Sequence, residues 1–577
     1  MKLRHWLPCI DWVASYDRMT AGKDGLAAVI VTLMLIPQSL AYAMLAGLPP
    51  ITGLYASIAP LLLYAVFGSS RTLAVGPVAV ISLMTAAALE PMFPSGSAAY
   101  IGAAMLLAAL SGVVLLLMAV LRLGFLANFL SHPVISGFIS ASGLLIALSQ
   151  FKYILGVSAE GQTVLQLIPS LAQQLPFINV PTLLIGGLCL VFLQLARTRL
   201  KGLLLALGLS SGWADSLTKT GPVLTIIVSV LIVTWGDLAS SGVHVVGAIP
   251  EGLPALRLPT MDWQLAMQLL PAALLISLVG FVESVSVAQT LAAKRRERID
   301  PDQELVGLGA ANIAAAVSGG FPVTGGFSRS IVNFDAGART PMAGILTALG
   351  IALTALFFTP LFHNLPHAVL AATIIVAVLS LVDFGSLKRT WRFSKQDFIA
   401  QAATMFGVLF MGVEIGIVMG VSLSLLLFLW RTSRPHSAVV GQLPGSEHFR
   451  NIERFNVIQS DTVLSLRVDE SLYFPNARYL EERIIELMVD YPDCQHLVLM
   501  CSGVNLIDAS ALDSLEAIAE RLTAAQVQLH LSEVKGPVMD QLRRSDFLNE
   551  FGGQVFVSQY AAMQALDPPS IMRAAQS

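Results

Sequence analysis

Apolar segments long enough to cross a lipid bilayer recur along the first three quarters of this 577-residue chain. A helix needs about 20 mostly apolar residues to span about 30 Å of hydrocarbon. Such segments lie at 24–45, 48–67, 98–121, 126–150, 181–196, 220–237, 265–292, 303–320, 341–361, 366–383, 397–413 and 415–431. Charged residues make up only 12% of the chain, whereas a soluble domain carries about 25%. We therefore predict an α-helical polytopic membrane protein.

Two further apolar pieces, 77–89 and 327–336, are too short to span a bilayer alone. Each follows an extended stretch that contains Gly and Pro, and counting both as half-crossings brings the total to fourteen segments. They occupy matching places, because Gly76 follows Gln38 by 38 positions and Gly325 follows Glu283 by 42. Paired interrupted segments predict an inverted repeat with a substrate site between them. The alternative interpretation is a pair of ordinary helix kinks.

Charge divides the chain into two domains. Residues 1–434 carry a net charge of +6 and residues 435–577 a net charge of −9, which together give the −3 of the whole chain. The change falls where the last apolar run ends at a basic pair and a proline. We predict a cytoplasmic N-terminal segment (1–23), a transmembrane domain (24–434), a linker (435–454), a soluble α/β domain (455–568) and a short tail (569–577).

Basic residues also predict the orientation in the membrane. If the N-terminus is inside, fourteen crossings place only Lys152 and Arg257 in outside loops. The inside loops then hold Lys2, Arg4, Arg18, Lys23, Arg71, Arg122, Arg197, Arg199, Lys201, Lys219, Lys294, Arg295, Arg296, Arg298, Arg339, Lys388, Arg389, Arg392 and Lys395. This asymmetry follows the positive-inside rule and places both termini in the cytoplasm. The first residues lack an apolar run with a cleavage site, so the segment is expected to be retained.

One basic residue, Arg329, falls at bilayer depth, where an ionisable group is a functional candidate. A helix that starts near Gly326 would point its free N–H groups and positive dipole end at the membrane centre, where Ser328 and Arg329 add donors. A second helix that starts at Gly76 and Pro77 would aim at the same place. This pattern predicts an anion site. The alternative is that Arg329 forms a fixed ion pair with Glu283 or with Asp335.

Glu283 lies near the middle of the eighth segment, with no compensating charge within a helical turn. A carboxyl group in apolar surroundings holds a proton more readily than one in water, so Glu283 is the candidate for proton coupling. Its alternative role is a structural hydrogen-bond partner for an interrupted backbone. Gln38 and Tyr42, one turn apart in the first segment, are candidate ligands or ordinary helix-packing contacts.

Several classes of protein are not indicated. The four cysteines, Cys9, Cys189, Cys494 and Cys501, form no metal-binding or redox pattern, and no metal or other cofactor is expected. No nucleophile and base pair or phosphate loop points to an enzyme. The net charge of −3 gives no basic excess for binding nucleic acid.

Three long motifs resemble the sulfate permease (SulP) family of anion transporters, which includes prestin. They are PQSLAYAMLAGLPPITGLY at 37–55, VGPVAV at 75–80 and FPVTGGFSRSIVN at 321–333. The resemblance covers nearly the whole chain. It implies a seven-plus-seven inverted repeat with core and gate subdomains, an elevator-like movement and a homodimer.

The same resemblance implies the site residues. The anion site of the family falls on Gln38, Tyr42, Val78, Phe327, Ser328 and Arg329, beside Gly326. The acidic position of the eighth helix falls on Glu283, a glutamate as in proton-coupled sulfate carriers. Where sodium-coupled members provide oxygen ligands, this chain has Val287 and Phe327, so proton coupling is favoured over sodium coupling.

The acidic C-terminal part has predicted strands at 463–468, 497–500 and 527–531 and helices near 476–489, 510–523 and 536–547. This α/β pattern resembles the STAS domain that closes SulP transporters. Ser510 stands where related bacterial proteins carry a phosphorylatable serine, so it is a regulatory candidate. The alternative is that Ser510 is simply the N-cap of a helix. A cytosolic partner of this domain is possible under the first interpretation.

Together these features predict a secondary active anion transporter of the bacterial inner membrane, with proton-coupled sulfate uptake as the leading hypothesis. A bicarbonate or dicarboxylate carrier coupled to sodium or protons remains an alternative within transport. So does an anion exchanger or an uncoupled anion channel. A membrane sensor that signals through the acidic domain is the alternative from another class.

Overall fold

A computed structural model describes the protein at all residues except 1–6, 129–130, 209–217, 219–220, 261 and 577. Lys2, Arg4 and Lys219, which the orientation argument places inside, lie outside the described residues. The chain forms two compact units, residues 1–424 and residues 425–577, and the boundary between them falls within the last long apolar helix. We call them the membrane unit and the C-terminal unit.

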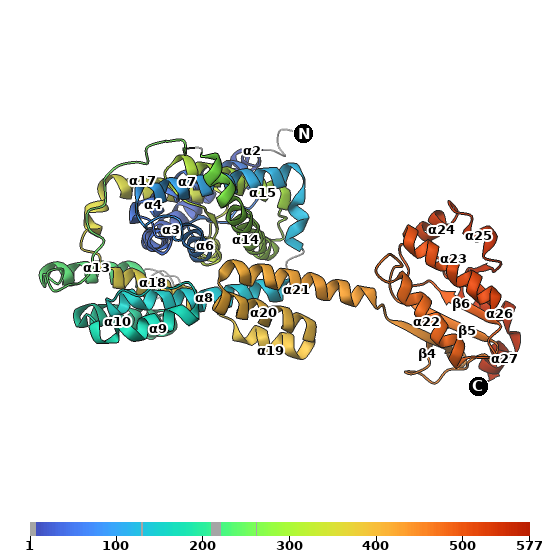
Figure 1. Ribbon diagram of the computed structural model, residues 1–577. Helices are drawn as coiled ribbons and strands as arrows, with labels where there is room; N and C mark the ends of the chain where they lie inside the picture. Colours follow the sequence, from blue (N-terminus) through green and yellow to red (C-terminus); the bar gives the residue numbers. More distant parts are fainter. Residues whose placement is uncertain (1–6, 129–130, 209–217, 219–220, 261, 577) are drawn as a thin grey trace. The chain divides into compact units, whose positions relative to one another are not determined.

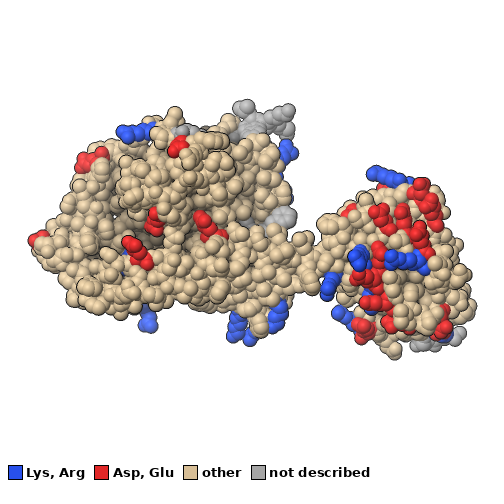
Figure 2. Space-filling view, viewed as in Figure 1, with Lys and Arg blue, Asp and Glu red and all other residues tan. Residues whose placement is uncertain are grey.

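Long apolar helices make up the membrane unit. Eight helices or joined helix pairs of the described chain are long and apolar enough to cross a bilayer, and three apolar helices are shorter. Figure 2 shows that few charged side chains reach the visible surface of this unit, whereas acidic and basic side chains are dense on the C-terminal unit. This distribution is that of a multi-pass membrane protein with a water-exposed second domain.

Figure 1 shows the helices of the membrane unit in two groups. The first, which we call the core group, contains α3 (Arg18–Leu45), α4 (Pro50–Tyr55), α5 (Ala59–Phe67), α6 (Ala79–Leu89), α7 (Ala98–Val120), α14 (Trp263–Arg295), α15 (Pro301–Val317), α16 (Phe327–Asp335) and α17 (Met342–Phe357). A short helix, α2 (Cys9–Ala14), precedes it. The group thus takes four successive segments from each half of the chain, as the predicted inverted repeat requires.

The second, which we call the gate group, contains the remaining helices. They are α8 (His132–Leu155), α9 (Val164–Gln174), α10 (Val180–Leu195), α11 (Lys201–Ala206), α13 (Gly221–Trp235), α18 (His367–Leu379), α19 (Phe384–Phe393), α20 (Lys395–Met411) and α21 (Val413–Ser433). Each predicted segment corresponds to one of these helices or to the pair α4 and α5. The helices α9, α11 and α19 lie outside the predicted segments; α11 is only six residues long, and α9 and α19 are amphipathic.

The two extended stretches before the short helices pair with each other at the centre of the core group. They are β1 (Val75–Gly76) and β2 (Thr324–Gly325), which run antiparallel with Val75 opposite Gly325. The prediction that the second short helix starts near Gly326 is confirmed, because Gly326 is the N-cap of α16. The first begins slightly later than predicted, since α6 starts at Ala79 with Val78 as its N-cap.

The C-terminal unit is a six-stranded sheet in the order β4-β3-β5-β6-β7-β8. Its strands are β3 (Ser437–Gln442), β4 (Phe449–Asn451), β5 (Val463–Val468), β6 (His496–Met500), β7 (Gln528–Ser532) and β8 (Val555–Phe556). Strands β5 to β8 are parallel, and β3 is antiparallel to both neighbours. Residues 435–454, expected as a linker, therefore contribute two strands to the sheet.

Helices cover both faces of this sheet. They are α22 (Ala477–Asp490), α23 (Ala509–Ala524), α24 (Gly536–Leu542), α25 (Phe547–Glu550), α26 (Gln559–Leu566) and α27 (Pro568–Gln576). Side chains alternate between faces along each strand, so Leu497 and Leu499 pack with α22 and α23 while Val498 packs with α26. The segment 569–577, expected as a tail, holds most of α27.

Candidate anion-binding site

Two short helices of the core group begin beside the β1–β2 pair. In α6 and α16 the N-cap residues, Val78 and Gly326, provide no side-chain cap. The pairing of Val75 with Gly325 just before them brings the two helix starts together. First-turn N–H groups have no partner within their own helix, and the helix dipole adds partial positive charge there. The arrangement favours an anion in front of both N-termini.

Buried hydroxyl groups hold the β1–β2 pair in place. The hydroxyl of Ser284 accepts a 2.8 Å hydrogen bond from the N–H of Gly325 and lies 2.7 Å from the hydroxyl of Thr324. On the other side, the hydroxyl of Ser330 accepts a 3.0 Å hydrogen bond from the N–H of Ala74. These contacts fasten α14 and α16 to the same crossing point.

Two asparagine side chains complete this support. The amide of Asn312 in α15 accepts from the N–H of Val323 at 3.0 Å and donates to its carbonyl at 2.9 Å. The amide of Asn333 in α16 donates to the carbonyl of Thr72 at 3.0 Å. Sequence reasoning did not single out these residues or the serines. The only sign of these asparagines and serines in the sequence is that each is a polar residue in an apolar segment. That sign does not show which group each side chain hydrogen-bonds to.

Arg329 lies in the first turn of α16 and is only 2% exposed. Both terminal nitrogens of its guanidinium are buried without a hydrogen-bond partner in the described part of the chain. The group lies against backbone, because a Cβ added at Gly76 would be 2.8 Å from Nη1 and one added at Gly326 would be 2.9 Å from Nε and Nη2. The glycines at both helix starts thus leave the space that the guanidinium occupies.

The alternative interpretation of Arg329 as half of a fixed ion pair is not supported. Glu283 is near enough to interact with Arg329 electrostatically, but neither it nor Asp335 accepts a hydrogen bond from the terminal nitrogens. Burying an unpaired charge costs several kcal/mol, and hydrogen bonds to an acceptor would offset that cost. The unsatisfied donors of Arg329 are therefore available to an anionic ligand.

The other predicted site residues divide into two sets. Tyr42 is buried and interacts electrostatically with both Arg329 and Glu283, and Val78 lies beside Gly326. Phe327 and Ser328 are exposed at the start of α16. Gln38 is half-buried one turn before Tyr42 and makes no hydrogen bond with any described residue of the site.

Glu283 faces the boundary between the two helix groups. It is half-buried and lines a cavity of about 30 Å³ with Val279 and Val282 of α14, Val134, Ile135, Phe138 and Ile139 of α8, and Ile417 of α21. Seven of its eight lining residues are apolar. The carboxyl group thus lies between the guanidinium of Arg329 on one side and an otherwise apolar cavity on the other.

Ser510 lies far from this site in sequence, in the first turn of α23 of the C-terminal unit. Asp508, and not Ser510, is the N-cap of that helix, because its carboxylate accepts a 2.9 Å hydrogen bond from the N–H of Ala511. The alternative interpretation of Ser510 as the cap is therefore wrong. The Ser510 side chain is exposed. Asp508 also accepts from the N–H of Phe474 at 2.9 Å, which holds the turn in place.

Among the residues that the structure describes, no group of three or more His, Cys, Asp or Glu side chains comes together in the way a metal site requires. The arrangement around Arg329 instead offers a positive guanidinium, two helix N-termini and exposed polar groups. Such paired broken helices at the centre of a multi-pass membrane unit define the architecture of a secondary transporter.

The chain belongs to the sulfate permease family. Residues 22–404 match the Sulfate permease family and residues 454–562 match the STAS domain. It is 36% identical to sulfate transporter 4.1, chloroplastic, of Arabidopsis thaliana over 96% of this chain and 82% of that protein. It is 32% identical to the "Probable sulfate transporter MT1781" of Mycobacterium tuberculosis, over 97% of this chain and 98% of that one.

The fold is also that of a solved structure, the overall structure of SLC26A9. The two superpose with a TM-score of 0.88 at 21% sequence identity, over 99% of this chain and 94% of the other. At this identity the likeness concerns the fold. It agrees with the membrane unit of core and gate groups in a seven-plus-seven inverted repeat, followed by a STAS domain.

Proposed function

We propose that this protein is a secondary active transporter that takes up sulfate together with protons. The observation that carries the proposal is the buried guanidinium of Arg329, whose terminal nitrogens have no partner in the described chain. Sulfate offers only acceptor oxygens, and its charge complements a guanidinium and two helix N-termini. The names of the relatives support sulfate over other small anions.

Glu283 is the proposed site of proton coupling. It lies within electrostatic reach of Arg329 and at the boundary between the core and gate groups, so its charge can respond both to the anion site and to movement of one group against the other. Sulfate is a dianion, and entry into a cell with a negative interior opposes it by about 2.3 kcal/mol per charge for each 100 mV. Each proton that moves with sulfate removes one such charge.

An elevator-like movement of the core group against the gate group is part of the proposal. All proposed ligands, on α3, α6 and α16, and Glu283 on α14 belong to the core group, and shared hydrogen bonds join β1, β2, α14 and α16. Such a group can carry a bound ion without losing its contacts. We further propose a homodimer in the bacterial inner membrane with both termini in the cytoplasm, on the basis of the family and of the basic loops.

The test is uptake of labelled sulfate by proteoliposomes that contain the full-length protein. We expect an inward proton gradient to increase uptake, and we expect Glu283→Gln to remove this dependence. Glu414→Gln is the matched control, because Glu414 is another half-buried carboxyl at the start of α21. Gradient-independent uptake by the unmodified protein would contradict proton coupling.

Competition by unlabelled anions identifies the substrate. We expect sulfate to compete best. Stronger competition by bicarbonate or a dicarboxylate would indicate the alternative carriers, and a requirement for sodium would indicate the other coupling ion. Currents far above carrier turnover in a planar bilayer would indicate a channel. Sulfate uptake that needs a counter-anion inside the vesicles would indicate an exchanger.

We propose Ser510 as a regulatory position of the C-terminal unit. Its exposed hydroxyl lies in the first turn of α23, where the negative charge of a phosphate would be stabilised by the helix dipole. A cytosolic partner that recognises the phosphate would then bind at this turn. We expect Ser510→Asp to change sulfate uptake and Ser510→Ala to leave it unchanged. Equal uptake by both variants would contradict the proposal.

A further inference from the structure

The helix α19 (Phe384–Phe393) lies in the gate group between two membrane segments. The preceding helix α18 ends at Leu379, and Ser394 is at once the C-cap of α19 and the N-cap of α20. Because α19 carries three basic residues among its ten and follows the apolar helix α18 closely, we expect it to lie at the membrane surface. The basic residues of this segment predict the cytoplasmic surface.

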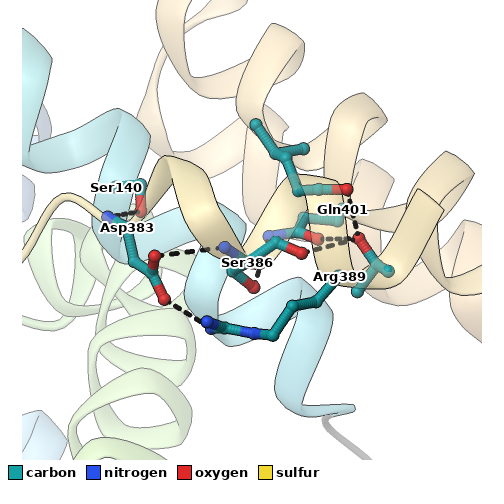
Figure 3. A network of polar contacts seen from close by, with 7 residues as sticks. Ser140, Asp383, Ser386, Arg389 and Gln401 are labelled. Carbon is teal, nitrogen blue, oxygen red and sulfur yellow. Dashed lines mark hydrogen bonds and ion pairs between the residues drawn. The ribbon is translucent and has the colours of Figure 1, made fainter. Parts of the chain in front are cut away.

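A network of polar contacts fixes the inner face of α19 (Figure 3). Asp383, its N-cap, accepts from the N–H of Ser386 at 3.1 Å and from Arg389 at 2.7 Å, and its own N–H donates to the hydroxyl of Ser140 in α8. The buried side chain of Gln401 in α20 donates to the hydroxyl of Ser386 at 3.1 Å. These contacts join α19 to both α8 and α20. They fix which face of α19 points toward those helices and which face points away.

The outer face carries cations and aromatic rings together. Lys388 and Arg392 are exposed and lie one helical turn apart on α19, and Lys395, also exposed, begins α20 just after the extended residue Ser394. Trp391 of α19 is 51% exposed, and Lys395 joins this face because its Nζ lies 3.2 Å from the centre of the Trp391 ring. Phe393 is 93% exposed. Arg389 is already paired with Asp383, whereas Lys388, Arg392 and Lys395 form no ion pair with any residue that the structure describes.

We propose that this face of α19 binds the phosphate groups of anionic phospholipids in the adjoining leaflet. Three clustered cations complement the lipid phosphates, and aromatic rings on a short amphipathic helix enter the interface between head groups and acyl chains. An acidic protein surface would match the cations but would leave the ring of Phe393 and the exposed half of Trp391 without an apolar environment. The lipid thereby anchors the gate group, through α8 and α20, at one depth in the membrane.

The test compares lipids around the full-length protein in vesicles of phosphatidylcholine with a minor share of phosphatidylglycerol. Discs are cut from these vesicles with a styrene–maleic acid polymer, and mass spectrometry gives the lipid ratio beside the protein. We expect phosphatidylglycerol to be enriched relative to the bulk vesicle. The triple variant Lys388→Gln, Arg392→Gln, Lys395→Gln should lower the enrichment at least about fivefold. A fivefold loss is the effect expected for one surface cation, so it is the minimum for the loss of three.

A matched triple variant removes the same charge elsewhere. Arg122, Arg296 and Arg298 are exposed, are predicted for the same side of the membrane, and lie outside α19. Their replacement by Gln should leave the enrichment unchanged. An equal loss in both triple variants would show that net charge alone is responsible, and no enrichment in the unmodified protein would show that α19 does not select anionic lipid. Either result overturns the proposal.

Discussion

The hydroxyl of Ser284 accepts a 2.8 Å hydrogen bond from the backbone N–H of Gly325. Ser284 follows the proposed coupling residue Glu283 in α14, and Gly325 directly precedes the N-cap of α16, which carries Arg329. This bond ties the two functional positions to one crossing point. The proposed coupling carboxyl and the candidate anion site are therefore held together by the same hydrogen bond.

Removal of the Ser284 hydroxyl should loosen that frame. In Ser284→Ala the N–H of Gly325 loses its partner, which costs about 1–3 kcal/mol for a buried donor. We expect thermal stability to fall and the affinity for sulfate to fall about tenfold. Ser277→Ala is the matched control, since Ser277 is a buried serine of α14 that contacts Ser111 instead. Equal affinity in both variants would contradict a role for Ser284 in positioning the site.

Replacement of Arg329 by an uncharged residue of similar length should make the empty protein more stable. Arg329→Met removes a buried charge without hydrogen-bond partners at its terminal nitrogens, so we expect unfolding in the absence of sulfate to require about 1–3 kcal/mol more. Sulfate should raise the Tm of the unmodified protein and have no effect on the variant. Differential scanning fluorimetry with and without sulfate measures both quantities.

Arg295→Met provides the contrast for this experiment. Arg295 donates to the carbonyl of Ala338 at 2.6 Å and stacks on the ring of Phe334. Loss of a partnered arginine should lower the Tm and should preserve the response to sulfate. A lower Tm for Arg329→Met without sulfate would mean that Arg329 has a partner after all.

Addition of one methyl group at Gly326 should displace the guanidinium. Its Cβ would lie 2.9 Å from Nε and Nη2 of Arg329 and 3.1 Å from Val78. We expect Gly326→Ala to fold normally and to lose at least about tenfold in sulfate uptake, because a misplaced ligand weakens binding strongly. In the control Gly102→Ala the new methyl group meets no atom within 4 Å. Unchanged uptake by Gly326→Ala would place the anion elsewhere.

Acid should destabilise the C-terminal unit through His530. Burial and the neighbouring His496 ring lower the pKa of His530 to about 4, and its Nδ1 accepts the N–H of Gln554. The unfolded chain takes up a proton near pH 6.5 and the folded unit only near pH 4, so stability falls as pH decreases through this window. The loss is at most about 3 kcal/mol.

Hydrogen exchange of the full-length protein, corrected for the intrinsic exchange rate at each pH, measures this effect in strands β6 and β7. Exchange should be faster at pH 5 than at pH 7. His530→Asn should lower stability at pH 7 but flatten its dependence on pH. A dependence as steep in the variant as in the unmodified protein would assign the effect to another group.

Much of the fold follows from local signals in the sequence. Apolar segments of the length of a bilayer appear as helices, and the Gly and Pro positions before 77–89 and 327–336 appear as the β1–β2 crossing. The strands β5, β6 and β7 were also predictable, because each is a short apolar run between turn residues. Strands β3, β4 and β8 were missed, since they are stabilised by pairing with neighbouring strands.

The candidate site was predictable in part. Arg329 and Glu283 stand out because charged residues are rare at bilayer depth, and the sequence alone shows this rarity. Ser284, Thr324 and Ser330 did not stand out, because serine and threonine are common in membrane helices and often bond within their own helix. The N-cap of α23 was ambiguous for a similar reason, since Asp508 and Ser510 are both residues that cap helices well.

The sequence by itself determined the order of the apolar segments, the two places where they break, and the identity of the charged residues left between them. Only the tertiary structure decided that the terminal nitrogens of Arg329 have no hydrogen-bond partner among the described residues. Glu283 and Arg329 lie in different helices, so their separation depends on how α14 and α16 pack around the β1–β2 pair. That packing places the guanidinium against the backbone of Gly76 and Gly326, and its unsatisfied donors are what make the site suitable for an anion.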